Sequence, residues 1–288
     1  SLEDYEIPDN PFDVTGDYLA CFSSLPRAAG IYLDLLSEIH RVKENDGHAA
    51  NAGSDSDYHE LVKQYTSQLE NSPADARLLI RRGDALFMLH EFEGAIQDYY
   101  RAIKINPALD DAWFGRGMVY GRNRQFDQAI ADLTVYLQRN PESSRGYTKR
   151  GVRYIWMGKL DLAKQDLRKA LAIDPSNAEA NDDLGVLYAQ EKQYERAAQH
   201  FHNSIKHDPG YQKAHHNLAM VNFLTGRQES ALSEIEKALE LDSQNRNSAM
   251  LKSEILARMG RANEAAEIAE NARLMEETSW SEQMTPVQ

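Results

Sequence analysis

The chain has 288 residues, 42% of them apolar, with a mean hydropathy of −0.63 and a formal net charge of −13 at pH 7. No stretch approaches the roughly 18 apolar residues that a membrane-spanning helix requires, so direct membrane insertion is not expected. The single cysteine, Cys21, cannot form an intramolecular disulfide, and nothing therefore indicates an oxidising compartment.

Charge is distributed unevenly along the chain. Residues 1–75 hold 15 Asp and Glu against 4 Lys and Arg, a net charge of −11. Residues 76–159 hold 9 acids against 14 bases, which gives +5, and residues 160–288 hold 21 against 14, which gives −7. A nucleic-acid-binding protein would normally show a strong basic face, so nucleic acid is not an expected partner.

The chain begins with an acidic segment, residues 1–43. Its first 15 residues carry no base, and their apolar side chains include Tyr5, Ile7 and Phe12. They also hold five acids: Glu3, Asp4, Glu6, Asp9 and Asp13. This start lacks both the basic region and the apolar core of a signal peptide. Further on, residues 28–42 place their apolar side chains on one face and predict an amphipathic helix.

A polar stretch, ENDGHAANAGSDSD, follows over residues 44–57 and predicts a mobile loop. Residues 58–71 then predict a helix that ends before Pro73, because proline cannot continue a helix. This helix takes the place of a second helix in the repeats that follow it. We therefore expect residues 58–75 to form half of a repeat.

Three residue types recur with one period of 34 residues. The prolines are Pro73, Pro107, Pro141, Pro175 and Pro209. The alanines are Ala95, Ala129, Ala163, Ala197, Ala231 and Ala265. The glycines are Gly83, Gly117, Gly151 and Gly185, continued by the small residues Ala219 and Ser253. A period of this length is typical of a repeat architecture.

Each period contains two amphipathic stretches, because apolar residues recur at i, i+3, i+4 and i+7 in both. Proline ends the second helix, since it lacks an N–H and clashes with the preceding turn. The Gly and Ala series mark the positions where the two helices cross closely. One such helix pair cannot bury its apolar face alone, so neighbouring pairs must stack.

This pattern resembles the tetratricopeptide repeat family. The resemblance implies an all-α fold, a right-handed superhelical α-solenoid of stacked antiparallel helix pairs. It covers about 70% of the chain, residues 76–279, and leaves residues 280–288 as a C-terminal tail. The six repeats are 76–109, 110–143, 144–177, 178–211, 212–245 and 246–279. For function the resemblance is broad, because one scaffold serves many partners.

A co-variation between the repeats predicts structural ion pairs. Three arginines lie one period apart: Arg82, Arg116 and Arg150. Three aspartates do the same: Asp98, Asp132 and Asp166. The next two repeats change both series: Leu184 and Leu218 replace the arginine, and His200 and Glu234 replace the aspartate. We expect each Arg, on a first helix, to form a bidentate ion pair with an Asp on a second helix through its planar guanidinium group.

No catalytic motif is present: the sequence has no Gly-rich phosphate loop, GxSxG, HExxH or CxxC. His200 and His202 are two residues apart and His215 and His216 are adjacent, whereas metal ligands on one helix require a spacing of three or four. We expect no enzymatic activity, no cofactor and no metal site. We also expect a cytoplasmic location, with a periplasmic or membrane-anchored full-length protein as the alternative.

The family resemblance implies that the first helix of each repeat lines a concave groove. It places eleven candidate partner contacts there: Arg77, Arg81, Asp84, Phe87, Phe114, Met118, Arg122, Arg145, Thr148, Lys149 and Trp156. Aromatic anchors and arginines contribute most of the binding energy at interfaces. For each apolar member, the alternative is that it fills a gap between neighbouring repeats.

The sequence therefore predicts a non-enzymatic scaffold or adaptor whose groove binds a partner protein or peptide, an acidic-aromatic segment being one candidate. The alternative is a self-associating assembly or regulatory module, a homo-oligomer, in which residues 1–15 occupy their own or a neighbour's groove. A third interpretation makes these residues a simple tail. Pairs such as Ile80 and Asp84 do not match the family's Lys–Asn clamp for chaperone tails, so that partner class is not expected.

Overall fold

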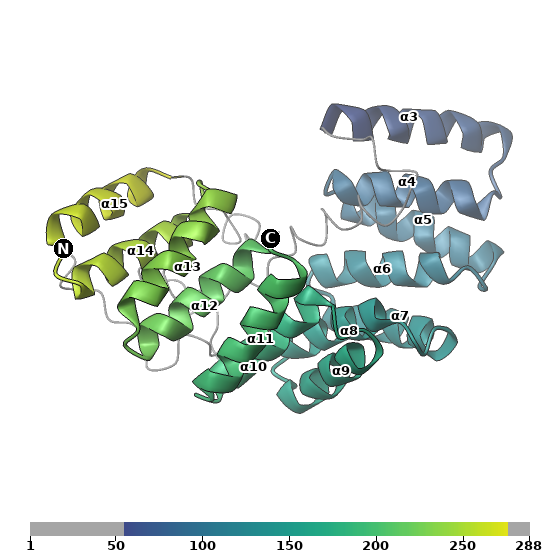
Figure 1. The fold of residues 1–288 in the computed structure, drawn as a ribbon. Helices are drawn as coiled ribbons and strands as arrows, with labels where there is room; N and C mark the ends of the chain where they lie inside the picture. Colours follow the sequence, from purple (N-terminus) through teal and green to yellow (C-terminus); the bar gives the residue numbers. More distant parts are fainter. Residues whose placement is uncertain (1–54, 276–288) are drawn as a thin grey trace. The chain divides into compact units, whose positions relative to one another are not determined.

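The computed structural model describes residues 55–275, which Figure 1 shows as helices in chain order. These residues belong to two compact units, 55–173 and 174–275, called the first and the second unit below. The expected helix over 28–42, Cys21, residues 44–54 of the expected loop and the tail 280–288 lie outside the described residues.

Seven helices make up the first unit. They are α3 (Asp55–Asn71), α4 (Ala76–Met88), α5 (Phe92–Ile105), α6 (Asp110–Arg122), α7 (Phe126–Arg139), α8 (Ser144–Trp156) and α9 (Leu160–Ile173). From α4 on, they form pairs, because α4 packs on α5, α6 on α7 and α8 on α9. The helix α3 packs on α4 ahead of the first pair.

Six helices make up the described part of the second unit. They are α10 (Ala178–Gln190), α11 (Tyr194–His207), α12 (Gln212–Leu224), α13 (Gln228–Leu241), α14 (Arg246–Arg258) and α15 (Ala262–Leu274). The pairs α10–α11, α12–α13 and α14–α15 stack in order. Over the described ranges the secondary structure is all helix and turn, so both units are all-α solenoids of stacked helix pairs. No helix in these ranges is long and apolar enough to cross a membrane.

The helix α3 begins at Asp55, three residues before the expected start. Residues 55–57 therefore belong to the helix and not to the predicted loop. Asp55 and Asp57 both lie in the first turn, where a negative charge is favoured by the positive end of the helix dipole. The polar composition of residues 44–57 predicted a loop, but it carries no information on where the next helix begins.

The turn between the two helices of each repeat contains one residue in the left-handed conformation. These residues lie one period apart: His90, Arg124, Gly158, Lys192, Gly226 and Gly260. Three of them are not glycine, although a left-handed backbone costs a side chain about 1–2 kcal/mol. The tight turn is thus imposed by the packing of the helix pair as well as by local sequence.

A side chain closes the turn after each of four second helices by accepting a hydrogen bond from the backbone two residues on, an Asx turn. The four pairs are Asn106 with Ala108, Asp174 with Ser176, Asp208 with Gly210, and Asp242 with Gln244. The acceptor residue is followed by the periodic proline in the first three. The turn and the proline together end the helix at the same place in successive repeats.

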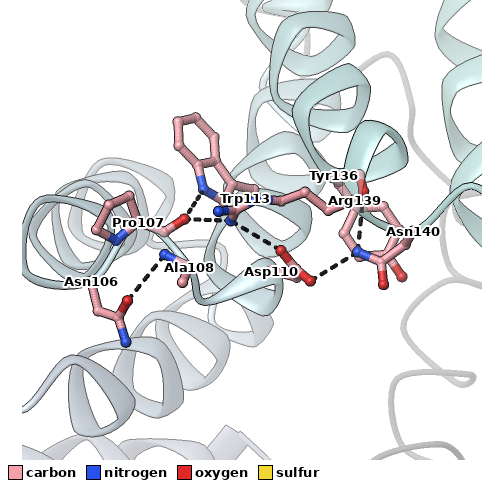
Figure 2. A network of polar contacts seen from close by, with 8 residues as sticks. All are labelled: Asn106, Pro107, Ala108, Asp110, Trp113, Tyr136, Arg139 and Asn140. Carbon is pink, nitrogen blue, oxygen red and sulfur yellow. Dashed lines mark hydrogen bonds and ion pairs between the residues drawn. The ribbon is translucent and has the colours of Figure 1, made fainter.

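Figure 2 shows how one such junction is tied to the next repeat. The carbonyl of Pro107 accepts hydrogen bonds from Trp113 Nε1 at 3.0 Å and from Arg139 Nη1 at 2.5 Å. Asp110 accepts from Arg139 at 3.1 Å and from Asn140 at 3.0 Å. The start of α6 is therefore joined to the end of α7, which fixes the register between the two helices of this repeat.

The core runs between the helices of each pair, where the periodic glycines lie. A Cβ at Gly185 would lie 2.7 Å from the fully buried ring of Phe201, so only glycine allows α10 and α11 to pack this closely. The alanine series is fully buried on the opposite helices: Ala95, Ala129, Ala163, Ala197, Ala231 and Ala265. Small residues thus bring the paired helices together in both units.

Candidate partner-binding surface

The first helices of the first unit touch one another in succession, because α4 contacts α6 and α6 contacts α8. We call the side of these three helices that carries the predicted groove residues the first-helix wall. Its members come from three repeats, so their relative positions are set by the stacking of the helix pairs. The structure divides the predicted residues into a buried floor and an accessible rim.

The floor consists of the predicted apolar contacts. Phe87, Phe114 and Met118 are 9%, 7% and 3% exposed and belong to the hydrophobic core of the first unit. The Phe114 ring, for example, lies 5.0 Å from the ring of Tyr136 on α7. These side chains are packing residues and not surplus apolar surface. Periodicity could not reveal this, because it shows which helix face is apolar but not which neighbour covers it.

Two polar residues of the wall are buried as well. Thr148 is fully buried, and its hydroxyl donates to the carbonyl of Ser144 at 3.0 Å on the same helix. Lys149 is 3% exposed. Burial of a charged side chain is unusual and costs free energy unless polar groups compensate the charge. Lys149 therefore depends on the polar groups around it on α8.

The rim consists of six predicted residues. Arg77 and Arg81 on α4 are exposed, and the half-buried members are Asp84, Arg122, Arg145 and Trp156. Two of them are fixed by the core beneath. The Arg145 guanidinium lies 4.3 Å from the centre of the Phe114 ring, a cation–π contact, and Asp84 accepts a 2.5 Å hydrogen bond from Tyr99.

Trp156 lies at the last residue of α8. Its ring stacks on that of Phe126, with the centroids 6.3 Å apart and an angle of 12° between the planes. The indole is therefore held in one orientation by α7 while part of it remains accessible. A rigid aromatic side chain of this kind makes contacts at a low cost in conformational entropy.

Arg153, on α8, is a further wall residue that sequence reasoning missed. It is fully buried, and its Nη2 lies 3.7 Å from the sulfur of Met118 on α6. A Cβ at Gly121 would lie 2.0 Å from Arg153 Nε, so Gly121 makes the room that this side chain occupies. The sequence contained a signal, because Arg145, Lys149 and Arg153 recur every four residues and so share one helix face.

The wall therefore has a strong excess of positive charge. Its accessible cations are Arg77, Arg81, Arg122 and Arg145, whereas Lys149 and Arg153 are buried. The predicted groove positions on the same three helices carry two acids: Asp84 and Asp111. Such a surface attracts acidic groups, and the attraction weakens as salt is added.

The predicted Arg and Asp side chains meet in all three repeats. Arg82 Nε lies 2.7 Å from Asp98 Oδ2, and the Arg116–Asp132 and Arg150–Asp166 pairs show the same distance. A second bond from Nη2 of each arginine makes every pair bidentate. The aspartates are buried and the arginines half-buried, so these pairs are structural links between paired helices.

Burial and pairing act in opposite directions on these groups. Burial raises the pKa of Asp132, and the hydrogen bonds from Arg116 offset part of that effect. Burial would also lower the pKa of Arg116, but the bonds to Asp132 hold it above the ordinary value. The hydrogen bond to Asp166 is the largest cause of the raised pKa of Arg150. Both partners are thus needed for the charged pair to be tolerated.

In the second unit, the polar pairs between the two helices of a repeat join residues that are about one helical turn further apart in the sequence than the Arg–Asp pairs. His200 Nδ1 lies 3.2 Å from Asn181 Oδ1, and His215 Nδ1 lies 2.7 Å from Glu234 Oε2. The partners are 19 residues apart, whereas those of the Arg–Asp pairs are 16 apart. Burial acts to raise the pKa of Glu234, but the hydrogen bonds from His215 and Lys237 hold it below the ordinary value.

The first helices of the second unit carry a different set of polar contacts. Asn217 Nδ2 donates to the carboxylate of Asp182 at 3.0 Å, and His216 Nδ1 lies 3.0 Å from Ser248 Oγ. Burial lowers the pKa of His216 to about 4, so this ring is neutral at pH 7. The 34-residue period does not predict these contacts, because they span neighbouring repeats at spacings of 35 and 32 residues.

No group of three or more His, Cys, Asp or Glu within residues 55–275 could hold a metal ion.

Family models of the tetratricopeptide repeat match residues 111–143, 148–211 and 188–255, and a model described as TPR repeat matches residues 83–123. The chain belongs to the tetratricopeptide repeat family. No curated protein sequence was found that matches it.

Several solved structures share the tetratricopeptide repeat fold of this chain. The structure of the APC/C hetero-tetramer Cut9–Hcn1 has a TM-score of 0.68 at 15% identity and covers 82% of this chain and 48% of the other. The chain thus spans about half the length of that protein. A tetratricopeptide repeat protein from Parabacteroides merdae has a TM-score of 0.63 at 19% identity and covers 85% of this chain and 93% of the other. The structure of PilF from Pseudomonas aeruginosa has a TM-score of 0.60 at 17% identity and covers 68% of this chain and 88% of the other.

Proposed function

We propose that the chain is a non-enzymatic interaction scaffold or adaptor, and that the first-helix wall binds an extended or helical segment of a partner protein. One observation carries the proposal. Four accessible arginines lie on three successive first helices, Arg77 and Arg81 on α4, Arg122 on α6 and Arg145 on α8, and α8 also carries the positioned indole of Trp156. Arg and Trp are the residue types most enriched at binding hot spots.

The way in which the core supports these side chains favours the same conclusion. Arg145 lies on the Phe114 ring and Trp156 on the Phe126 ring, so each contact group is held by a side chain of the unit itself. Less conformational entropy is lost on binding when a contact group is already ordered. The apolar floor serves as support for the rim in this proposal, which differs from the direct anchoring expected from the sequence.

Capture of partners from the native cell extract tests the proposal. The variant Arg122→Ala/Arg145→Ala removes two rim cations without opening a cavity in the floor. Its control, Lys104→Ala/Lys159→Ala, removes two exposed cations from outside the wall. We expect mass spectrometry to find partners that the wild type and the control retain and the wall variant loses. Equal capture by all three proteins would contradict binding at the wall.

Self-association is the second candidate, favoured by the contrast between the net charge of −11 over residues 1–75 and +5 over residues 76–159. Opposite charges on one chain can join two copies head to tail. Sedimentation velocity over a hundredfold range of concentration separates the candidates. A sedimentation coefficient that rises with concentration and falls back in high salt supports assembly, and a constant monomer value contradicts it.

A further inference from the structure

We propose that Arg116, Tyr100 and Tyr120 form a carboxylate-binding site on the first unit, where an acidic side chain of a further partner protein binds. This inference goes beyond the function proposed above, which rests on the first-helix wall alone. Phe114 and Met118 on α6 belong to that wall, and Arg116 lies two residues from each of them. Two residues of an α-helix turn by about 200°, so Arg116 lies on the opposite side of α6.

One nitrogen of Arg116 lacks the hydrogen bond that its counterparts in the neighbouring repeats make. Arg82 Nη1 on α4 donates to Thr66 Oγ1 on α3 at 3.1 Å. Arg150 Nη1 on α8 donates to Thr134 Oγ1 on α7 at the same distance. Within residues 55–275, Arg116 Nη1 has no such partner, although its Nε and Nη2 bind an aspartate as in the other two arginines. This Nη1 is not fully buried, so a ligand oxygen can reach its two charged N–H groups.

Tyr100 accounts for this difference, because it occupies the threonine position of the repeat. It lies one period from both Thr66 and Thr134. A threonine hydroxyl is attached directly to Cβ, whereas the tyrosine hydroxyl lies at the far end of a ring, and Tyr100 is 43% exposed. The short contact that the threonines make is therefore not made here, and Arg116 Nη1 keeps its capacity to donate.

The hydroxyl groups of Tyr100 and Tyr120 lie near this donor. Burial acts to lower the pKa of Arg116, whereas its hydrogen bonds to Asp132 and the nearby phenol groups of Tyr120 and Tyr100 act to raise it. Among the described residues, neither of these two hydroxyl groups has a hydrogen-bond partner. Three groups with unused donor capacity are thus clustered at one place on α5 and α6.

Aromatic rings shield this cluster from water. The guanidinium carbon of Arg116 lies 5.2 Å from the centre of the Trp113 ring and 5.7 Å from that of Tyr120. The Arg116 side chain is 12% exposed. A charge-assisted hydrogen bond is stronger where water competes less, so an anionic ligand is bound more firmly here than by a fully solvated cation.

The charge of the site matches that of a carboxylate. Asp132 neutralises Arg116, and the Lys104 ammonium, 4.8 Å from the centre of the Tyr100 ring, adds one positive charge. The residues at the position of Lys104 in the two neighbouring repeats carry no positive charge. A carboxylate has one negative charge, whereas a phosphate ester has about 1.5–2 at pH 7. The site therefore suits an Asp or Glu side chain, and the exposure of Tyr100 lets a protein deliver it at the surface.

Titration of the full chain with sodium acetate tests the site, followed by nuclear magnetic resonance of nitrogen-15-labelled arginine. The side-chain Nε–Hε signals of the three paired arginines are assigned with the variants Arg82→Lys, Arg116→Lys and Arg150→Lys. At an ionic strength held constant with sodium chloride, acetate should shift the Arg116 signal along a saturating curve and leave the other two in place. No shift of the Arg116 signal, or equal shifts of all three, would overturn the proposal.

The variant Tyr100→Thr tests why the donor is available. A threonine at this position should accept from Arg116 Nη1 as in the neighbouring repeats. Acetate binding should then weaken roughly tenfold, since one charge-assisted hydrogen bond to the ligand is lost. Unchanged signals of Arg82 and Arg150 show that the variant is folded. An unchanged acetate affinity in the folded variant would contradict the assignment of Nη1 as the donor.

The reverse exchange transfers the site to the next repeat. The Arg150 guanidinium already lies near two rings, 5.7 Å from the centre of Tyr147 and 5.9 Å from that of Tyr154. The variant Thr134→Tyr/Gln138→Lys supplies the phenol and the cation, so the Arg150 signal should now respond to acetate. If it stays insensitive while circular dichroism shows an intact fold, release of Nη1 does not create the site and the proposal is wrong.

Three further probes establish the class of ligand. Acetylglycyl-glutamyl-glycinamide should bind at least as tightly as acetate, because the carboxylate of the proposed partner is a side chain, and its glutaminyl counterpart should not bind. Sodium phosphate should bind more weakly than acetate, since its charge exceeds that of the site. Exclusion of the glutamyl peptide, or a preference for phosphate, would overturn the proposal. Neither result bears on partner capture by the first-helix wall, which is tested through Arg122 and Arg145.

Discussion

Arg116 holds the carboxylate of Asp132 through two nearly parallel hydrogen bonds, from Nε at 2.7 Å and from Nη2 at 2.9 Å. The Asp132 side chain is 6% exposed and that of Arg116 is 12% exposed. The pair therefore joins α6 to α7 at a place that water hardly reaches. Its counterparts in the neighbouring repeats have the same geometry, which makes the contact a repeated link of the first unit.

We predict that Arg116→Leu lowers the free energy of unfolding by about 3–5 kcal/mol, because it leaves the Asp132 charge buried without its partner. The double variant Arg116→Leu/Asp132→Leu should cost clearly less than Arg116→Leu alone, as in the repeat where Leu184 occupies the arginine position. Urea unfolding followed by circular dichroism measures both. The exposed pair Arg261–Glu264 is the control, and Arg261→Leu should have no measurable effect.

Acid sensitivity of the second unit should depend on His216. The pKa of this buried histidine is lowered to about 4, so between pH 6.5 and pH 4 the unfolded chain binds a proton that the folded chain does not. Stability is therefore lost as the pH falls through this window. From pH 7.5 to pH 5 the wild type should lose about 2 kcal/mol more than His216→Gln. Urea unfolding at both pH values measures the difference, and equal losses would contradict a neutral buried ring.

The left-handed turn residues predict a cost that comes from the backbone alone. Gly226 has a φ of +77°, and no atom lies within 4 Å of the place where its Cβ would be. Gly226→Ala should therefore cost about 1 kcal/mol without any steric clash. The control is Gly210→Ala, whose nearest atom lies at 3.4 Å and whose φ is outside the left-handed region. Thermal unfolding should show a lower midpoint for the first variant only.

The position of Arg153 should depend on the absence of a side chain at residue 121. Gly121→Ala places a Cβ 2.0 Å from Arg153 Nε, and the arginine must move. We expect a loss of about 1–3 kcal/mol in the free energy of unfolding, as for other overpacked sites. The double variant Gly121→Ala/Arg153→Met should recover most of it, because the clash is gone. Additive losses in the double-mutant cycle would show that the two residues do not interact.

The sequence was sufficient for the repeated features of the fold and insufficient for features that differ between repeats. The 34-residue period predicted the helix pairs, and the joint change of Arg and Asp predicted which side chains meet. Periodicity did not separate the floor from the rim, because Phe114 and Arg145 occupy equally regular positions. Phe114 belongs to the floor because Tyr136 of α7 and Arg145 of α8 both lie against its ring.

The polar contacts of the second unit were missed for a related physical reason. Asp182 and Asn217 lie on first helices of different repeats and one position out of phase, so the period does not connect them. The shift of the His215–Glu234 pair by one turn was also hidden, because it appears in the sequence only as the loss of an arginine. Contacts between repeats depend on the stacking of the helices, which a single period does not specify.

Arginine-specific labelling with phenylglyoxal, read by mass spectrometry with and without a captured partner, tests the central claim most directly. If the first-helix wall binds the partner, Arg77, Arg81, Arg122 and Arg145 become protected, while the exposed Arg101 and Arg124 outside the wall react as before. Protection of Arg101 and Arg124 with unchanged labelling of the four wall arginines would contradict the account.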